Sequence, residues 1–518
     1  MGNLSQSLSE HLRGIAGGIV LFPLSIVNCL MRRGTEDSDD EDDDESDSID
    51  IDPFEAVLER VQVKHIGRYV AATRAKKHPS GKKIPVVEVG TPVPVWEYLC
   101  YRVKFADGVS WMLKVPAIGT PDQFDEDDAE ALRSEALTMM MLRRETTIPI
   151  PEVFSYNNTC KNKLKVPFIL MEFIDARPLD EVWHDRESPK EVVQARRTRC
   201  LQDIAAAYLQ LGKYTFNKCA PLKFDDQDCL TGVVPVENDP FSGFREVCTS
   251  RLDRWGQEES ESEKGLLKLL RMFVDWTPES SDGKSFVLCH PNPNIFNFLV
   301  AEDGSVRAIL DWHGAHANPP SIGNEQYPLW LMRDWDPTVY MWSEDMERRE
   351  HDEDYMCEDS PDTLEFYRNV YAQCIANLRP ESENAKLTRN SPLFQHLMTA
   401  TSHTLFSLGQ AGKIFDEVVK RVEKHVDDNS CPASVDSPNE NEKDNKKDSS
   451  SKEDASCDHN SPDETEDHVE HGSIEADRDE DEDEHFDMDE FIKSLGRDGL
   501  SEHRKKLFKA GFEALFIS

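Results

Sequence analysis

The sequence contains no Cys-x-x-C pair, although it has twelve cysteines in 518 residues. Paired cysteines at short spacing are the usual sign of a zinc site or a disulfide framework, and neither is indicated. Isolated cysteines such as Cys200, Cys289 and Cys374 stand in apolar surroundings. We therefore predict core thiols in a reducing compartment. Internal repeats are also lacking, so repeat architectures are not indicated.

The chain also lacks an excess of basic residues. It has 59 Lys and Arg against 100 Asp and Glu, for a formal net charge of -41. A nucleic-acid-binding protein needs a basic face, so we expect no nucleic-acid partner. Much of the acidic excess lies in residues 35–52 and 427–484, which contain few large apolar residues. Such segments cannot form a core, and we predict that both are disordered.

Long apolar runs are almost absent. Residues 14–31 are the exception, with Arg13 before them and Arg32-Arg33 after them. A bilayer-spanning helix needs about 20 apolar residues, and this stretch is interrupted by Pro23 and Asn28. No small-residue cleavage site of a signal peptide follows it. Three interpretations stay open, namely a disordered or loosely docked arm, a membrane-associated helix, and an incorrectly assigned start codon. We expect a cytoplasmic protein, with membrane association through residues 14–31 as the alternative.

What the chain does contain is a strand, loop and hairpin between residues 286 and 312. The apolar run 286–289 predicts a buried strand, and the polar loop 290–297 follows it. Two short strands, 298–300 and 306–310, flank a Glu-Asp-Gly turn and form a hairpin. The hairpin brings Asn297, before its first strand, close to Asp311, after its second. An amide oxygen and a carboxylate suit Mg²⁺, although turn and capping residues are the alternative interpretation.

This pattern resembles the aminoglycoside phosphotransferase and choline kinase family of the protein-kinase-like fold. That family carries His-x-Asp-x-x-x-x-Asn, a short hairpin and then Asp, and this chain has His290, Asn292, Asn297 and Asp311 at those positions. Residues 322–337 resemble the stretch after the family's metal aspartate, as in a fungal member. The resemblance implies an α+β, two-lobe fold with a small antiparallel-sheet lobe and a larger helical lobe. Asn292 is the departure, because it stands where the family has its catalytic aspartate.

Upstream, the sequence predicts a helix over 54–74 and strands over 84–89, 99–105 and 110–115. Lys114 on the third strand resembles the strand lysine of kinases, and Glu135 follows in a helix around 129–137. We predict that the two pair and that Lys114 holds the α- and β-phosphates of a nucleotide. A solvent-facing lysine is the alternative.

The resemblance implies further roles near this pair. His290 would brace the loop, Asn292 would orient the acceptor, and Asn297 with Asp311 would hold Mg²⁺. Adenine would bond the backbone near Glu172 and Phe173, although a plain core strand explains residues 168–174 equally well.

The phosphate-covering loop departs from the family. Between the first two strands the chain reads Gly-Thr-Pro-Val-Pro-Val-Trp-Glu, in which only Gly90 is a glycine. Pro92 and Pro94 offer no backbone N–H to a phosphate. We therefore expect a weaker or differently built phosphate cradle.

The remaining elements complete a predicted organisation in five parts. Amphipathic helices are predicted over 192–211, 363–378 and 393–426, with one or two short helices within 488–517 that dock on the large lobe or bind a partner. The aromatic loop 314–337 either packs structurally or lines an acceptor site with Trp312, Trp330 and Trp335. The predicted parts are an arm and spacer (1–52), a small lobe (53–175), a large lobe (176–427), an acidic linker (428–485) and terminal helices (486–518).

Two functional hypotheses follow. The first is an ATP- and Mg²⁺-dependent phosphotransferase that acts on a hydroxyl of an unknown small molecule and whose activity is weak or lost because of Asn292. The second is a pseudokinase that binds nucleotide, or nothing, and works through protein partners of its acidic tails and terminal helices.

Overall fold

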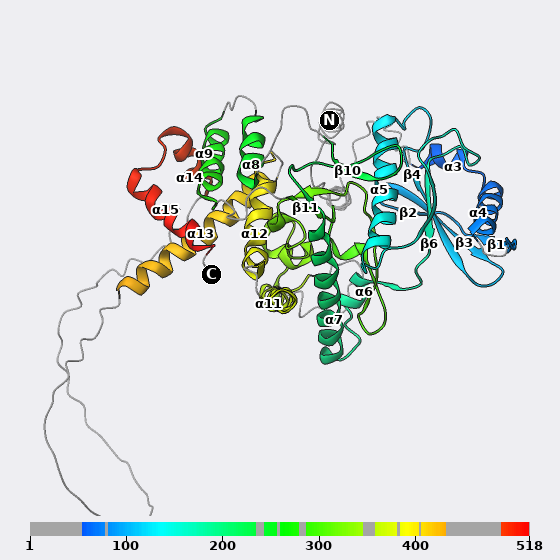
Figure 1. Cartoon of the computed structure of the whole chain (residues 1–518). Coiled ribbons are helices and arrows are strands. Elements are labelled where there is room, and N and C mark those ends of the chain that lie inside the picture. The colour runs from blue at the N-terminus through cyan, green and yellow to red at the C-terminus, as the bar shows by residue number, and fades with distance from the viewer. Residues whose placement is uncertain are drawn as a thin grey trace, which may run out of the picture.

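The computed structural model describes nine stretches of the chain (Figure 1). They are residues 54–77, 81–234, 243–255, 260–278, 286–344, 358–380, 384–402, 406–430 and 488–516. The apolar stretch 14–31 and most of the two acidic segments lie outside the described residues. No helix in these nine stretches is long and apolar enough to cross a membrane.

The first lobe is built on an antiparallel sheet with strand order β1-β3-β4-β6-β5, in which β2 also pairs with β3. Along β3 the side chains alternate between buried and more exposed positions, as the period of two requires. Its buried members face α3 and α4, and the opposite face carries Lys114. The strands are β1 (Val86–Val89), β2 (Val93–Val95), β3 (Tyr98–Phe105), β4 (Ser110–Pro116), β5 (Val153–Asn157) and β6 (Phe168–Glu172).

Three helices complete this lobe, namely α3 (Glu55–Arg60), α4 (Val63–Lys77) and α5 (Glu126–Glu145). The single helix predicted over 54–74 is therefore wrong, because the backbone turns extended at Val61. Val57 and Val70 still reach one core, so the predicted apolar spacing survives the break. Asp125 starts α5 with a capping box, since its side chain accepts from the N–H groups of Asp127 and Asp128.

The second lobe is mainly helical and holds two small sheets and a separate hairpin. One sheet has the order β8-β11-β14 and the other β13-β12-β7, while β9 pairs with β10. The strands are β7 (Arg177–Pro178), β8 (Thr215–Phe216), β9 (Leu222–Phe224), β10 (Leu230–Val233), β11 (Phe286–Cys289), β12 (Phe298–Val300), β13 (Val306–Ile309) and β14 (His316–Asn318). The predicted 286–312 strand and hairpin thus correspond to β11, β12 and β13.

The helices of the second lobe surround these sheets. They are α6 (Leu179–Trp183), α7 (Lys190–Leu209), α8 (Phe244–Asp253), α9 (Glu261–Trp276), α11 (Pro361–Leu378), α12 (Asn384–Ala400) and α13 (Ser407–Ser430), with short 3₁₀ turns η1 (Gln210–Lys213), η2 (Ile295–Asn297), η3 (Pro320–Ile322) and η4 (Leu329–Trp335). The predicted helix over 393–426 is two helices, and α13 continues past the predicted boundary at 427. An α+β fold with a sheet lobe and a helical lobe is confirmed.

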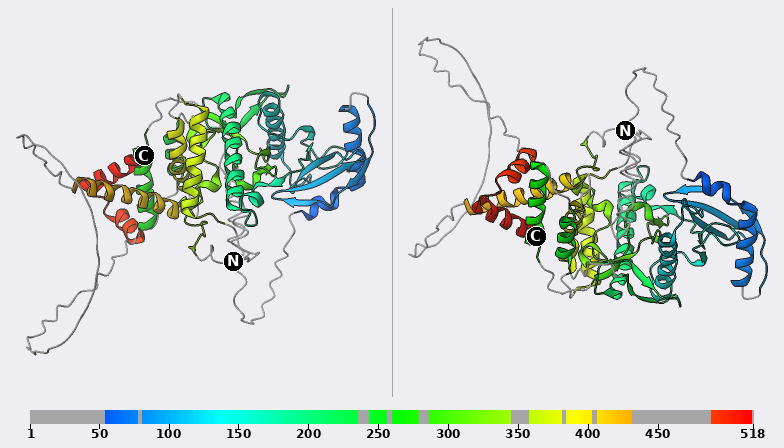
Figure 2. Two further views of the ribbon diagram at one scale, coloured as in Figure 1. Left: turned by 90° about the horizontal axis from the view of Figure 1, so that it is seen from below. Right: turned by 90° about the horizontal axis from the view of Figure 1, so that it is seen from above.

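Two terminal helices, α14 (Met488–Arg497) and α15 (Glu502–Ala514), pack against α9 and α13 (Figures 1 and 2). The Phe512 ring stacks on Phe273 with centroids 5.1 Å apart. The Nζ of Lys268 donates to the carbonyls of Leu495 and Gly496, at 3.0 and 2.7 Å, and so caps α14. Of the two predicted arrangements, docking on the large lobe is the one the structure shows.

The α9–α14 crossing is close because glycines face it from both sides. A Cβ added to Gly265 would lie 1.9 Å from the carbonyl oxygen of Ile492, and one added to Gly496 would lie 2.0 Å from that of Glu261. No side chain fits such a gap without moving a helix.

We predict that Gly265→Ala destabilises the chain by about 1–3 kcal/mol through overpacking, although alanine is the better helix former by about 1 kcal/mol. Urea unfolding of the full chain measures the change. Gly412→Ala in α13 is the matched control, because its Cβ would meet nothing closer than Met488 atoms at 4.0 Å. A Gly265→Ala chain as stable as wild type would mean that α9 and α14 do not approach this closely in solution.

Candidate active site

Lys114 and Glu135 form a buried ion pair between the sheet and α5. Lys114 lies on β4, the central strand, where it pairs in register with Cys100 on β3 and Ile169 on β6. Its Nζ is 2.6 Å from Oε1 of Glu135. Burial is the largest single influence and lowers the pKa of Lys114, but the charges of Glu135, Tyr98 and Asp311 and the hydrogen bond to Glu135 together raise that pKa well above the usual value. Both groups therefore stay charged, and the pair fixes α5 against the sheet.

Lys114 also contacts the second lobe. Its Nζ is 3.4 Å from Oδ1 of Asp311, which lies two residues after the end of β13. Asp311 has φ 58°, a left-handed conformation that Asp and Asn adopt more readily than other residues with a side chain. One ammonium group therefore joins a helix of the first lobe to the end of the hairpin in the second lobe.

His290 ties the loop 290–297 to the same hairpin. Its Nε2–H donates to the carbonyl of Leu310 at 2.7 Å, and its Nδ1 accepts from the N–H of Asn292 at 3.2 Å. The imidazole packs edge-on against Trp312, with centroids 4.6 Å apart. Burial lowers the pKa of His290 to about 4, so the ring is neutral at physiological pH. Both ring nitrogens are used to hold the loop.

The two asparagines of the loop lie against each other. Nδ2 of Asn297 donates to the backbone carbonyl of Asn292 at 2.8 Å. This bond turns the NH₂ group of Asn297 into the loop and leaves its amide oxygen for other partners. Oδ1 of Asn292 is buried and has no hydrogen-bond partner among the described residues. An amide oxygen from Asn297 and a carboxylate from Asp311 are a donor set that fits Mg²⁺.

The hairpin above the site brings two aromatic residues that the sequence analysis missed. Strands β2 and β3 pair from Val93↔Cys100 to Val95↔Tyr98, so the proline-bearing segment is strand rather than an open loop. The Tyr98 ring centroid is 3.8 Å from Nζ of Lys114, a cation–π contact. Trp96, with φ 55°, packs near Phe296 of the loop 290–297, with centroids 6.3 Å apart. The space beside the ammonium group therefore holds an aromatic ring.

Tyr98 could have been found from the strand period. Cys100 is opposite Lys114 in the β3–β4 register, and Tyr98 is two residues before Cys100. A period of two puts both on the face that carries Lys114.

His313 is a second residue that sequence reasoning missed. Its Nδ1 is 3.8 Å from Oε2 of Glu135, and its ring lies 6.1 Å from that of Tyr98. Burial lowers the pKa of His313, but the Glu135 carboxylate more than offsets this and the net shift is upward. Only tertiary structure could show this contact, since 178 positions separate the two residues.

Glu172 and Phe173 direct their side chains away from this centre. The Glu172 carboxylate pairs with Arg143 at 3.4 Å and accepts from the N–H of Glu152 at 3.2 Å. Its own backbone N–H donates to the carbonyl of Glu152 at 2.8 Å, so that N–H is not open to adenine. The Phe173 ring lies 4.1 Å from the Arg102 guanidinium.

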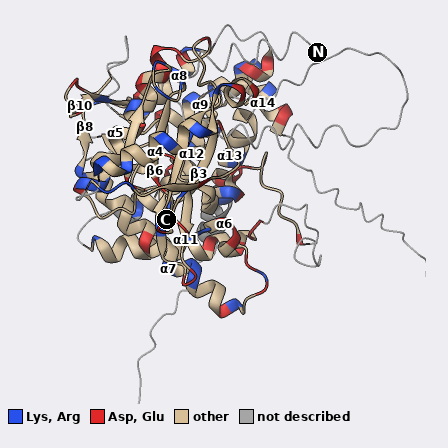
Figure 3. Cartoon of the chain, turned by 90° about the vertical axis from the view of Figure 1, so that its right-hand side faces the viewer, with Lys and Arg blue, Asp and Glu red and all other residues tan. Residues whose placement is uncertain are grey.

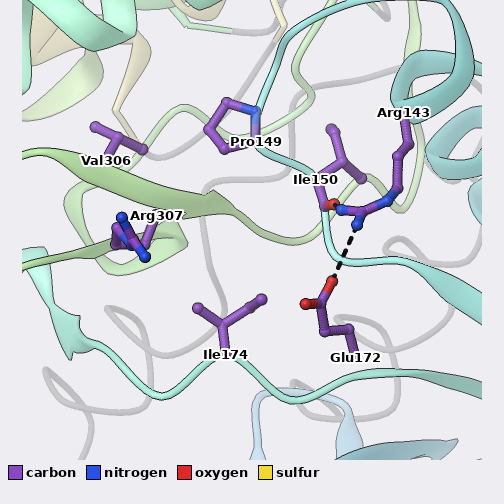
Figure 4. Close-up of a pocket in the computed structure, with 7 residues that line it drawn as sticks. All are labelled: Arg143, Pro149, Ile150, Glu172, Ile174, Val306 and Arg307. Atoms are coloured by element: carbon purple, nitrogen blue, oxygen red, sulfur yellow. Dashed lines mark hydrogen bonds and ion pairs between the residues drawn. The ribbon is translucent and has the colours of Figure 1, made fainter.

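The Glu172 side chain lines a cavity of about 310 Å³ (Figure 4). Neither Lys114 nor Asp311 lines this cavity, so it is separate from the charged centre. Its walls are Arg143, Pro149, Ile150, Glu172, Ile174, Val306 and Arg307.

Trp312, Trp330 and Trp335, in and just before the loop 314–337, mainly pack against other side chains. Trp312 is 0% exposed and Trp330 is 6% exposed, and both belong to the core around α7. Trp335 stacks near His396, with centroids 5.9 Å apart. An acceptor site lined by Trp312 and Trp330 is therefore wrong, because neither ring reaches the surface.

Among curated proteins, the chain is similar to "Altered inheritance of mitochondria protein 9, mitochondrial" of several yeasts. The Candida albicans (strain SC5314) protein is 30% identical over 148 residues, which cover 28% of this chain and 23% of that protein. The Debaryomyces hansenii protein is 29% identical over 163 residues, which cover 31% of this chain and 25% of that protein. The chain thus spans about a quarter of the length of the curated relatives it matches. Their mitochondrial name contradicts the cytoplasmic location that we predicted from the sequence.

Two solved structures are similar to part of this chain. A putative aminoglycoside phosphotransferase from Ralstonia eutropha JMP134 is 14% identical, covers 70% of this chain and 90% of its own, and has a TM-score of 0.41. The amicoumacin kinase hAmiN, solved with AMP-PNP and Ca²⁺, is 12% identical and has a TM-score of 0.37. The match covers 72% of this chain and 96% of the hAmiN chain.

Residues 96–322 match the model of the family described as "Phosphotransferase enzyme family". These residues run from the tip of the β2–β3 hairpin, through Lys114 and Glu135, to the end of η3, and so contain the whole charged centre. The matched region is less than half of the 518 residues, and through it the chain is similar to the phosphotransferase enzyme family.

Proposed function

We propose that this chain binds ATP with Mg²⁺ between its lobes and transfers the phosphoryl group to a small-molecule hydroxyl slowly or not at all. The observation that carries the proposal is the contact series from Glu135 to Lys114 to Asp311, at 2.6 and 3.4 Å. It places a fixed positive charge beside a carboxylate at the meeting point of the two lobes. Phosphoryl transfer depends on such positioning and electrostatic stabilisation more than on covalent chemistry by the protein.

Each residue of the centre has a proposed task. Lys114 would bind the α- and β-phosphates while Glu135 keeps its side chain in place. Asn297 and Asp311 would hold Mg²⁺, which neutralises phosphate charge when bound. His290, neutral and bonded at both nitrogens, would keep the loop 290–297 at a fixed distance from Asp311.

Asn292 is the reason to expect slow transfer. Its amide oxygen can accept a hydrogen bond from an acceptor hydroxyl, but an amide cannot take up the proton. Loss of a general base costs roughly 10²–10⁴ in rate. The acceptor itself stays unidentified.

Tyr98 favours the second candidate, a pseudokinase that acts through protein partners. Its ring lies where phosphates would approach Lys114, and the hairpin that carries it contains Pro92 and Pro94. Nucleotide binding would have to move this ring. The docked helices α14 and α15 leave the acidic segments as the proposed sites for protein partners.

We predict that ATP and Mg²⁺ together raise the melting temperature of the full chain, and that each alone has a smaller effect. Saturation at 100 times Kd stabilises by about 2.7 kcal/mol, which is roughly 5–10 °C for lobes of this size. Asp311→Asn should abolish the part that needs Mg²⁺, because an amide binds the cation weakly. Asp303→Asn, the same change in the hairpin turn, is the control and should behave as wild type.

The variants Asp311→Asn and Tyr98→Ala show why ATP and Mg²⁺ would fail to raise the melting temperature as predicted. An unchanged shift in Asp311→Asn would put the nucleotide somewhere else. A shift in Tyr98→Ala but not in wild type would mean that the hairpin closes the site. No shift in either chain would contradict the proposed function.

We predict that Asn292→Asp increases ATP hydrolysis by about 10²-fold or more, because a carboxylate at this position accepts the proton of the attacking hydroxyl or water. Phosphate release at saturating ATP and Mg²⁺ measures it. Asn294→Asp adds the same charge to the same loop and should give no gain. If ATP–Mg²⁺ binds yet Asn292→Asp stays inert, Asn292 is not what limits transfer.

We predict that the free energy of unfolding falls between pH 7 and 4.5 in part because of His290. Its folded pKa of about 4 lies below the usual 6.5, so the unfolded chain takes up the proton first. The stabilisation is therefore complete above pH 6.5 and is lost as the pH falls toward 4. Urea titrations should show wild type losing roughly 2–3 kcal/mol more than His290→Asn over this range. The control is His503→Asn, at an exposed position of α15, for which the free energy of unfolding should change with pH as in wild type. If this pH dependence were equal in wild type and both variants, the pKa of His290 would not be lowered in the folded chain.

A further inference from the structure

The first lobe has a basic side that contrasts with the acidic chain. Helix α4 carries five Lys and Arg residues and no Asp or Glu, whereas the whole chain has a net charge of -41. The loop between β5 and β6 adds Lys161, Lys163 and Lys165 within five positions. Figure 3 views the molecule from this lobe, with Lys and Arg in blue.

The basic residues of α4 and the lysines of the β5–β6 loop come together at the junction of α3 and α4. Nε of Arg60, at the end of α3, donates to the carbonyl of Lys165 at 2.7 Å. On the α4 side of this junction, Lys64 and Arg68 are one turn apart and exposed. We define the basic patch as Arg60, Lys64, Arg68, Lys161, Lys163 and Lys165.

The charges of the basic patch are not neutralised within the described chain. None of its six residues has an ion-pair partner among the described residues, and all except Arg60 are exposed. The acidic side chains on the same elements are Glu55 and Glu59 of α3. Basic residues therefore outnumber acidic ones three to one on this surface.

Apolar side chains are exposed beside these charges. Leu58 is 38% exposed on α3, and Val63, at the start of α4, is 47% exposed. The phenol of Tyr69 on α4 bonds Ser155 at 2.9 Å. Apolar side chains among lysines suit the interface of an anionic bilayer, whereas single-stranded nucleic acid needs exposed aromatic rings to stack on.

The patch and Lys114 lie on opposite sides of the first-lobe sheet. Helices α3 and α4 cover the sheet face that carries Leu99, Tyr101 and Leu113, whereas Lys114 is on the opposite face. The described chain also begins at Phe54, next to α3, and the apolar stretch 14–31 lies upstream of it. Two weak membrane signals acting together bind far better than either alone.

We propose that the basic patch docks the first lobe on an anionic lipid surface, with the sheet face that carries Lys114 turned away from it. This inference does not depend on the proposed phosphotransfer. The attraction between the patch and an anionic surface is electrostatic, so binding should be strongest at low ionic strength and fall with added salt.

Sedimentation of the full chain with vesicles tests the proposal. Vesicles of 70% phosphatidylcholine and 30% phosphatidylserine should bind the chain at 50 mM salt, and pure phosphatidylcholine should not. Each basic residue near such a surface contributes roughly fivefold. The combined variant Lys64→Glu, Arg68→Glu, Lys161→Glu and Lys163→Glu should therefore reduce partitioning by at least about 100-fold.

Variants in other regions of the chain show whether the basic patch or another region binds the vesicles. Arg504→Glu, Lys505→Glu, Lys506→Glu and Lys509→Glu place the same charge change on α15 and should bind as wild type. Equal binding to both kinds of vesicle would overturn the proposal. So would a patch variant that still binds while Leu21→Asp, in the apolar stretch, abolishes binding. A single-stranded RNA 20-mer that binds the patch more tightly than the vesicles would identify a nucleic-acid site instead. Melting temperatures of all variants identify any that fail to fold.

Discussion

The structure depends on one buried ammonium group. Removing a charge from water costs several kcal/mol unless a well-placed partner compensates it. Lys114 has two carboxylate partners, Glu135 at 2.6 Å and Asp311 at 3.4 Å, which come from α5 and from the second lobe. Because the cost of an unpaired lysine is high, this residue constrains the helix, the sheet and the end of the β12–β13 hairpin together. The ion pair between Lys114 of the first lobe and Asp311 of the second lobe is one contact that fixes how the lobes meet.

The same ammonium group makes the centre ambiguous in function. Its charge suits phosphate, yet the Tyr98 ring already lies 3.8 Å from it. Nδ1 of His313 lies 3.8 Å from the second carboxylate oxygen of Glu135. A nucleotide must therefore compete with contacts that the chain makes for itself. Asn292 bears on the proposed transfer as well, because an amide at this position cannot accept a proton from a hydroxyl.

The terminal helices show how much of the second lobe is assembled from distant sequence. Phe512 and Leu495 are buried in one core with Phe273 and Phe415, although the residues 431–487 between them and α13 lie outside the described chain. The close contact between α9 and α14 leaves no room for a side chain at Gly265 or Gly496. These helices therefore complete the hydrophobic core of the lobe.

The sequence by itself determined the fold class, the strand and hairpin around His290 and Asp311, and the residue types of the charged centre. The strand and hairpin follow from local rules, since the strand period, the Glu-Asp-Gly turn and the spacing of polar residues are all fixed within a few positions. The fold class and the charged centre were implied by the resemblance of those residues to a known family. It could not determine the break at Val61, the two helices α12 and α13, or the hydrogen bond that occupies the N–H of Glu172. Nor could it place Tyr98 on Lys114, His313 beside Glu135, or α14 on α9. Those contacts join residues far apart in the chain, and only the packing of whole elements decides which distant side chains share a buried charge.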